Sequence, residues 1–302
     1  MICFYHSMDL DGICSGAVVK TAYPHCKMIG YDYGQPFPWH AITVKELVYM
    51  VDVSLSPMDM KMLATVAELV WIDHHKSAIE QVHALGLSID GIRDVGFSGC
   101  ELAWAFLHAL PIDKAPRAVR MLGRYDVWDH AYSPDVMPFQ YGMRALNLNP
   151  ESWQWKPLLL GDDRDLYTEI VCQGAGIVAY EKGVSASIAH QYAFEQDVAG
   201  LRCIVLNRPA GNSQMFASVY DPSRHDAMCA FAWHEGMWRV SLYADKPEID
   251  VSQIARTFGG GGHKSAAGWK SAELPWNKTA VGTAGPFSGQ TFPRADGSPS
   301  ES

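Results

Sequence analysis

Cysteine is scarce in this sequence, and its arrangement argues against two kinds of small-domain scaffold. Only seven cysteines occur in 302 residues, and no two of them are spaced as CxxC. An odd, scattered set does not suit a disulfide framework, and the lack of CxxC pairs disfavours a structural zinc site. We therefore expect a reducing compartment and a cytoplasmic location.

The sequence also has few basic residues and few long apolar runs. Lysine and arginine number 24 against 33 aspartates and glutamates, which gives a formal net charge of -9. This balance argues against a broad binding surface for long duplex DNA or RNA, but it is compatible with short nucleotides bound through metal ions. Since the N-terminus has no basic segment and no apolar run is long enough to cross a bilayer, we expect neither a signal peptide nor a membrane helix.

The first half of the chain alternates apolar, strand-like runs with helical patterns. Strands are expected near residues 1–5, 27–31, 46–53 and 68–73, and helices near 13–23, 58–66, 77–85, 98–109 and 115–122. Ser56 and Pro57 are residue types favoured at an N-cap and at the first helical position. This alternation predicts an α/β domain with a mostly parallel sheet and helices on both faces. Residues 133–160 show no clear period, and we predict no element there.

The second half begins with a helical pattern and then becomes β-like. A helix is expected over about residues 165–196, although its three glycines weaken that prediction. The runs RCIVLN, MFASVY, AMCAFAW and MWRVSLY follow, and the turn HEG joins the last two as a hairpin. Trp233 and Trp238 could stack on nucleobases, but on strands we expect them in the core. A helix over residues 251–258 precedes GGGGHKSAAG, in which KSAAG is helix-like.

These changes in pattern divide the chain into four parts. We place an N-terminal α/β domain at residues 1–160, a helical linker at 161–199, a second domain at 200–271 and a tail at 272–302. The tail is rich in Gly, Pro, Ser and Thr and has few apolar residues, so it is predicted to be disordered.

Acidic and histidine side chains gather where the predicted strands end. In the stretch VWIDHHKS, residues 70–77, Asp73, His74 and His75 follow the end of a buried strand, and Asp52 ends the preceding strand. Ligands of open α/β sheets bind outside the carboxyl ends of the strands. The loop HSMDLDG after the first strand supplies three further side chains, His6, Asp9 and Asp11.

Such a group of acids requires compensation by positive charge. Several carboxylates facing one crevice repel each other at neutral pH unless cations neutralise them. Mixed imidazole and carboxylate ligands suit Mn²⁺, Fe²⁺, Co²⁺ or Zn²⁺ better than Ca²⁺, and two such ions suit phosphoryl chemistry. Taken singly, Asp11 or Asp52 could be an N-cap, and Asp126, in a loop after a helix, could be a turn residue. Their joint occurrence favours a metal site, with Asp129 of YDVWDH as a rival to Asp126.

These segments resemble the motifs of a known enzyme group. HSMDLDG, the acid of YMVDVS, WIDHHKS and the acid of GRYDVWDH are similar to the four motifs of the DHH phosphoesterase superfamily. GGGGHKSAAG resembles the signature of the DHH-associated C-terminal domain found in its oligoribonuclease (nanoRNase), RecJ-like and cyclic-dinucleotide phosphodiesterase branches. The resemblance covers roughly residues 1–269. It implies a five-stranded-type, mostly parallel sheet and a smaller α/β C-terminal domain with a mixed sheet.

The resemblance also implies a role for each matching residue. One metal ion would be held by His6, Asp9 and Asp52. The other would be held by Asp11, Asp52, His74 and Asp126, which makes Asp52 the bridge. Asp73 would orient ligands or the nucleophilic water, and His75 would face the scissile phosphate. Substrate would be bound by Gly259, Gly260, Gly261, Gly262, His263 and Lys264.

The resulting prediction is a hydrolase of phosphodiester bonds. We expect a two-metal phosphodiesterase or exonuclease that converts short single-stranded RNA or DNA oligonucleotides to mononucleotides. Mn²⁺ is the expected metal, with Mg²⁺ or Co²⁺ as alternatives. Alternative substrates are 3′-phosphoadenosine 5′-phosphate and linear or cyclic dinucleotides, and a nucleotide-binding module without activity is a further alternative. Long duplex nucleic acid and membranes are not expected partners, and a homodimer is one of the oligomeric states left open.

Overall fold

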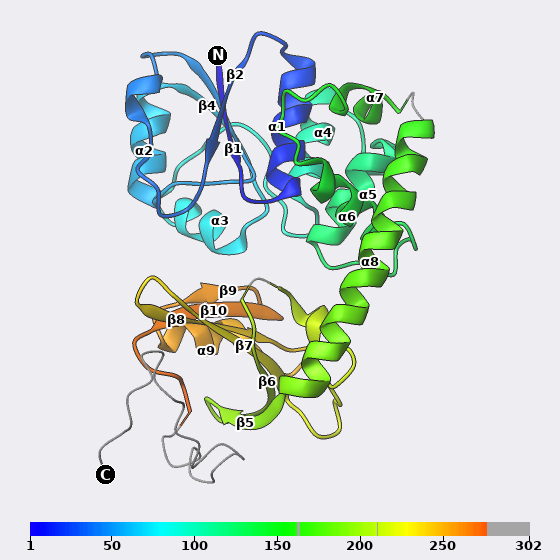
Figure 1. Cartoon of the computed structure of the whole chain (residues 1–302). Coiled ribbons are helices and arrows are strands. Elements are labelled where there is room, and N and C mark those ends of the chain that lie inside the picture. The colour runs from blue at the N-terminus through cyan, green and yellow to red at the C-terminus, as the bar shows by residue number, and fades with distance from the viewer. Residues whose placement is uncertain (162–163, 210, 277–302) are drawn as a thin grey trace, which may run out of the picture. The chain divides into compact units, whose positions relative to one another are not determined.

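The computed structural model describes residues 1–161, 164–209 and 211–276 (Figure 1). The chain divides into two compact units, the first over Met1–Tyr180 and the second from Glu181 onward. Helix α8 (Arg164–Tyr192) contributes to both units. Within the described residues, no helix combines the length and the apolar character that a membrane span requires.

The first unit is built on a parallel sheet. Its strands are β1 (Ile2–His6), β2 (Lys27–Tyr31), β3 (Leu47–Val51) and β4 (Glu68–Ile72), in the order β2-β1-β3-β4. All three strand pairs are parallel. A fifth segment runs along β4 and the residue after it and forms the isolated parallel bridges Val70–Asp90 and Asp73–Arg93. The α/β class with a mostly parallel sheet is thus confirmed, and the fifth strand is reduced to two bridges.

Helices bury both faces of this sheet, which explains why its strands are continuous apolar runs. Side chains alternate between the faces, so Cys3 and Val51 belong to one core and Phe4 and Met50 to the other. In Figure 1, one face is covered by α2 (Pro57–Val66) and α3 (Lys76–His83), and the other by α1 (Leu10–Ala22), α4 (Gly99–His108) and α5 (Arg117–Asp126). Ser56 caps α2 through the amide of Asp59, as its position before Pro57 predicts.

Two helices lie where no element was predicted. Helices α6 (Val136–Leu146) and α7 (Trp155–Leu160) carry Pro138 and Pro157 in their first turns, where proline is tolerated. Helix α8 runs for 29 residues despite its glycines and ends before residue 196. A Cβ on Gly174 would lie 1.7 Å from the carbonyl oxygen of Pro138, so this glycine lets α6 and α8 approach closely.

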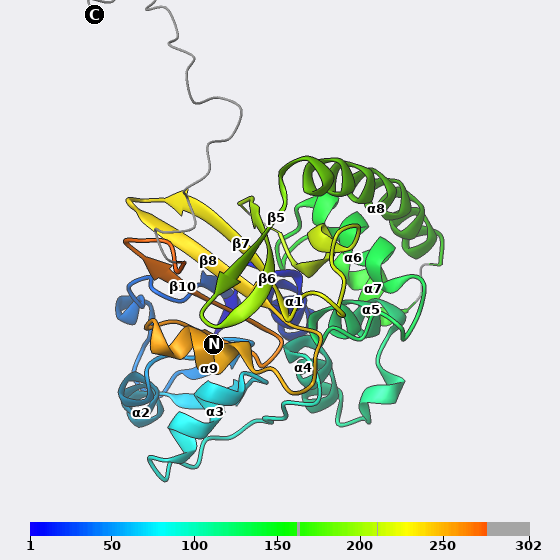
Figure 2. The ribbon, with the colours of Figure 1, turned by 90° about the horizontal axis from the view of Figure 1, so that it is seen from below.

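The second unit contains a mixed sheet, which confirms the second part of the fold prediction. Its strands are β5 (Phe194–Val198), β6 (Leu201–Asn207), β7 (Ala227–His234), β8 (Met237–Tyr243), β9 (Gly261–Gly262) and β10 (Ala266–Ser271), in the order β5-β6-β7-β8-β10-β9. Only β6 and β7 pair in parallel among these described strands. Helix α9 (Val251–Thr257) packs on one face through Val251 and Ala255 (Figure 2).

Several predictions for the second unit need correction. The run MFASVY is not a strand, because Ser213–Phe216 form the 3₁₀ helix η3. The KSAAG segment is not helical, because Ala266 begins β10. Trp233 is 57% exposed and is therefore not a core residue, whereas the predicted hairpin between β7 and β8 is present.

The expected disordered tail falls mainly on residues 277–302, which lie outside the described residues. Its first residues are described, and there Trp276 packs on the ring of Phe231 at a centroid distance of 5.0 Å. The core of the second unit therefore extends beyond residue 271.

Candidate metal centre

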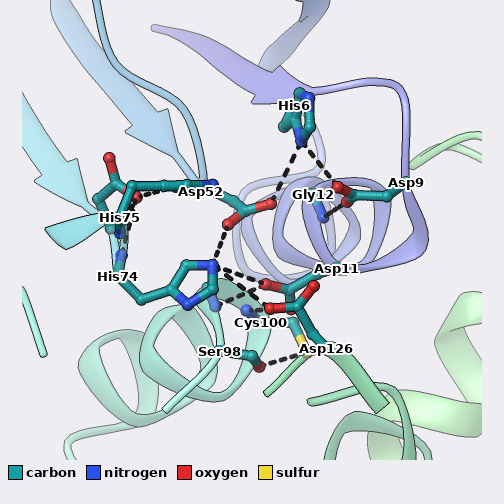
Figure 3. Close-up of polar contacts among 12 residues, drawn as sticks. His6, Asp9, Asp11, Gly12, Asp52, His74, His75, Ser98, Cys100 and Asp126 are labelled. Atoms are coloured by element: carbon teal, nitrogen blue, oxygen red, sulfur yellow. Dashed lines mark hydrogen bonds and ion pairs between the residues drawn. The ribbon is translucent and has the colours of Figure 1, made fainter. Parts of the chain in front are cut away.

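The candidate site lies where neighbouring parallel strands end. Strand β1 ends at His6, Asp52 directly follows β3, and Asp73 and His74 directly follow β4. Because β1, β3 and β4 are adjacent and parallel, these residues meet at one edge of the sheet (Figure 3). Asp9 caps α1 by accepting a hydrogen bond from the amide of Gly12, so Asp11 lies in the first turn of a helix and not in a loop.

One group of side chains forms around His6. Its Nδ1 lies 2.9 Å from Oδ2 of Asp9 and 3.7 Å from Oδ2 of Asp52. Ligand atoms of His6, Asp9 and Asp52 all lie within 4.8 Å of one another. These are the three residues that the family resemblance assigns to the first metal ion.

A second group forms around His74. Its Nε2 is 3.2 Å from Oδ1 of Asp52, 3.4 Å from Oδ2 of Asp126 and 3.8 Å from Oδ2 of Asp11. Asp52 therefore presents one oxygen to each group, as a bridging carboxylate would (Figure 3).

Asp126 reaches this group from the last position of α5 and not from a loop. Its rival Asp129 pairs with Nη1 of Arg124 at 3.8 Å, and its side chain is 42% exposed. Among the described residues, Asp129 belongs to none of the groups of potential ligands. The geometry thus favours Asp126 as the last ligand.

The backbone around Asp52 is unusual. Asp52 is 1% exposed and has a φ of 57°, in the left-handed region that aspartate tolerates better than most residues. A Cβ on Gly99 would lie 2.6 Å from Oδ1 of Asp52, so the start of α4 leaves room only for glycine. Backbone strain of this kind is concentrated at functional sites.

Helix α4 also anchors Asp11, and the sequence alone did not predict this contact. The two carboxylate oxygens of Asp11 accept hydrogen bonds from the amides of Gly99 at 2.7 Å and Cys100 at 2.8 Å. Amides at a helix N-terminus favour a negative charge. The capping box of Ser98 and Glu101 marks this helix start in the sequence, but it does not identify Asp11 as the partner.

The carboxylates have strongly perturbed pKa values. Burial, followed by repulsion from Asp11, raises the pKa of both Asp52 and Asp126 well above the usual value. Burial alone would lower the pKa of His6, but the nearby carboxylates of Asp52 and Asp9 raise it to about 10. Burial likewise opposes ionisation of Asp9, yet His6 keeps its pKa below the usual value. The cluster therefore favours bound positive charge.

The donor atoms fit divalent cations. Oδ1 of Asp52 is buried and has no hydrogen-bond partner among the described residues. It converges with oxygens of Asp11 and Asp126 on the imidazole of His74. A divalent cation would satisfy these buried lone pairs and relieve the repulsion, and mixed oxygen and imidazole ligands suit Mn²⁺ and similar ions.

Asp73 has a different position from the other acids. It is fully buried, and its Oδ1 lies 2.7 Å from Nδ1 of His75 and accepts hydrogen bonds from the amides of His74 and His75. Its Oδ2 accepts a hydrogen bond from Nε1 of Trp71. Burial opposes protonation of His75, but the contact with Asp73 outweighs it and raises the pKa of His75. Asp73 is thus placed to orient the His75 ring.

The glycine-rich segment lies in the second unit, between α9 and β10. Gly262 has a φ of 141°, and a Cβ there would lie 2.6 Å from the carbonyl oxygen of Ala266. Gly261 and Gly262 pair with β10, and the amide of His263 donates to Ala266. The residues from Gly261 to Lys264 are exposed. Their part in substrate binding stays a prediction.

Comparisons with known proteins bear on the fold. No family model matches this sequence, and neither does any curated protein. Among solved structures, the DHH domain of a member of a family of ribosomal proteins aligns with a TM-score of 0.56 and 13% identity, over 88% of this chain and 81% of that one. The fold is that of DHH-domain proteins. The structural similarity thereby confirms the fold that the resemblance of the sequence motifs implies.

Two further solved structures are similar to this chain in fold. The pGpG-specific phosphodiesterase PggH from Vibrio cholerae aligns with a TM-score of 0.53 and 12% identity, over 90% of this chain and 93% of that one. An exopolyphosphatase-related protein from Bacteroides fragilis gives a TM-score of 0.52 and 14% identity, over 92% of this chain and 88% of that one. At these identities the likeness concerns the fold alone.

Proposed function

We propose that this protein is a metal-dependent phosphodiesterase that hydrolyses short oligonucleotides to mononucleotides. The observation that carries the proposal is that Asp52 presents one oxygen to His6 and the other to His74, between the two groups of potential ligands at the carboxyl edge of the sheet. Such sites, when they hold two divalent cations, activate a water molecule and stabilise the charge that develops on a phosphoryl group.

The residues of the first unit have distinct parts in this proposal. His6, Asp9 and Asp52 hold one cation, and Asp11, His74 and Asp126 hold the other together with Asp52. Asp73 keeps the His75 ring oriented through its contact with Nδ1. His75 then binds a non-bridging oxygen of the scissile phosphate. In the metal-free protein the same contact with Asp73 raises the pKa of His75.

The glycine-rich segment of the second unit supplies substrate affinity. The segment Gly259, Gly260, Gly261 and Gly262, with His263 and Lys264, binds a terminal phosphate or nucleotide, because glycines let a phosphate approach the backbone closely. A site that grips a chain end in this way prefers short substrates. The shared fold with a pGpG-specific phosphodiesterase favours linear dinucleotides as the shortest of them.

The test is a substrate panel with Mn²⁺. One arm of the panel contains labelled RNA and DNA oligonucleotides of about 2 to 20 nucleotides. The other arm contains 3′-phosphoadenosine 5′-phosphate and cyclic dinucleotides. We expect mononucleotide products and the fastest turnover for the shortest linear chains. Cleavage without preference for short chains, or turnover of 3′-phosphoadenosine 5′-phosphate alone, would replace the proposed substrate class.

Asp52→Asn separates an active metal site from a silent nucleotide-binding fold. We expect this variant to lose turnover and to lose the rise in Tm that Mn²⁺ produces in wild type. Without metal, the variant should be at least as stable as wild type, because a buried carboxylate is removed. Asp129→Asn is the matched control and should behave as wild type. Retention of the Mn²⁺-induced rise in Tm by Asp52→Asn would contradict the assignment.

A further inference from the structure

Planar side chains from residues next to Asp126 form a stack with Arg144 in the first unit, in which the Trp128 ring is tilted by 49° from that of His130. The guanidinium of Arg144 lies 5.3 Å from the ring centroid of Tyr125. The ring of His130 stacks on Tyr125 at 5.2 Å and 22°, and Trp128 lies 4.3 Å from His130. Tyr125 is 8% exposed, whereas Trp128 is 42% exposed. The stack therefore leads from the core to an exposed indole.

The backbone of Trp128 is held in an unfavourable conformation. Its φ of 62° lies in the left-handed region, directly after the C-cap of α5, where glycine is the usual residue. The conformation is fixed by hydrogen bonds from the amide of Trp128 to the Tyr125 carbonyl and from the amide of Asp129 to the Arg124 carbonyl. A bulky residue in this position is unfavourable for folding, which points to a role of its side chain outside folding.

Trp128 also lies close to the candidate metal centre. It is two residues from Asp126, so the two Cα atoms are at most about 7 Å apart. Burial lowers the pKa of the neighbouring His130, which keeps that imidazole neutral. The exposed indole of Trp128 therefore presents an aromatic face two residues from a candidate ligand, and this face suits a nucleobase better than a phosphate.

We propose that Trp128 stacks on a base of the nucleotide whose phosphodiester lies at the metal centre. This inference rests on the proposed function and adds a residue that determines substrate affinity. Stacking provides affinity without basic residues, in keeping with the formal charge of -9. It also tolerates any base, since every base presents an aromatic face.

The experiment measures KM and kcat with Mn²⁺ for a dinucleotide and for two analogues that lack either the 5′ or the 3′ base. Trp128→Gly and Trp128→Ala should raise the dinucleotide KM by about 5- to 100-fold with little change in kcat, and Trp128→Phe should restore most of the affinity. One of the two analogues lacks the base that Trp128 contacts. For that analogue, wild type and Trp128→Gly should have the same KM. Trp153→Ala, which removes a tryptophan that is 70% exposed, is the matched control.

Trp128→Gly also separates binding from folding. Glycine suits the left-handed backbone, so its Tm should not fall, whereas a purely structural tryptophan would lose stability. An unchanged dinucleotide KM, or the same rise in KM for the dinucleotide and both analogues, overturns the inference. If wild type hydrolyses no dinucleotide, the proposed function fails separately. Calorimetric binding of AMP to Mn²⁺-loaded protein then tests stacking alone, and equal affinity of wild type and Trp128→Gly overturns it.

Discussion

Asp52 meets several constraints that few residue types can satisfy together. Its backbone is left-handed, its side chain is 1% exposed, and its two oxygens face different groups of potential ligands. Asparagine would tolerate the backbone but could not supply the charge. The close contact with Gly99 further limits where the carboxylate can lie.

Gly99→Ala should therefore weaken metal binding without removing any ligand. The new Cβ would lie 2.6 Å from Cβ and Oδ1 of Asp52 and would displace that carboxylate. We expect a loss of Mn²⁺ affinity of about 10- to 100-fold, as for other changes that disturb ligand orientation. Isothermal titration measures it. Gly176→Ala is the control, because a Cβ there meets nothing within 4 Å and alanine favours the helix.

Helices α4 and α5 are joined by one buried ion pair. Nη2 of Arg124 lies 2.8 Å from each carboxylate oxygen of Glu101, which is 1% exposed. The N-terminus of α4 holds Asp11, and α5 carries Asp126. The ion pair thus sets the spacing between two candidate ligands that belong to different helices.

Arg124→Met should destabilise the protein by about 3–5 kcal/mol, because it leaves the Glu101 carboxylate buried without its partner. Urea unfolding measures the free energy change. Replacing both partners, in Glu101→Leu with Arg124→Met, should recover most of the loss, since no unpaired charge remains. If the double variant is as unstable as Arg124→Met alone, the loss of stability does not come from the unpaired, buried carboxylate of Glu101.

The candidate ligands that follow strands were predictable from the sequence. The positions of those that lie in helices were harder to predict. Each buried parallel strand is a continuous apolar run, so the acid at its end is evident, as with Asp52. The predicted helix ended before Gly123, yet α5 continues through it to Asp126. The reason is tertiary: Gly123 packs against Glu101 and Ser98, where a Cβ would lie only 2.6 Å from them.

Local composition misled the other predictions. The alanines of KSAAG suggest a helix, but β10 forms because Ala266 to Ser271 pair with β8. Prolines hid α6 and α7, although a proline in the first turn does not disrupt a helix. The two errors thus have different causes: β10 takes its structure from a strand distant in the sequence, whereas α6 and α7 were missed through a local rule about proline.

The charge of the whole chain predicts how binding responds to salt. With a formal charge of -9, substrate affinity has to come from bound cations and a few local contacts and not from a basic track. Between 50 and 200 mM salt, the KM for a dinucleotide should change by less than about tenfold, against about 10³- to 10⁵-fold for proteins with many phosphate contacts. Steady-state kinetics across this range checks it, and a steeper dependence would indicate an extended basic surface.

The candidate ligands come from positions as far apart in the chain as His6 and Asp126. No short segment of the unfolded chain holds enough of them to bind a cation tightly, so the ion binds the native state and contributes to its stability by mass action. Because these distant segments must first be brought together, the cation acts mainly after the rate-limiting step of folding. Bound metal would then slow unfolding far more than it speeds folding, and metal depletion would shorten the lifetime of the folded chain.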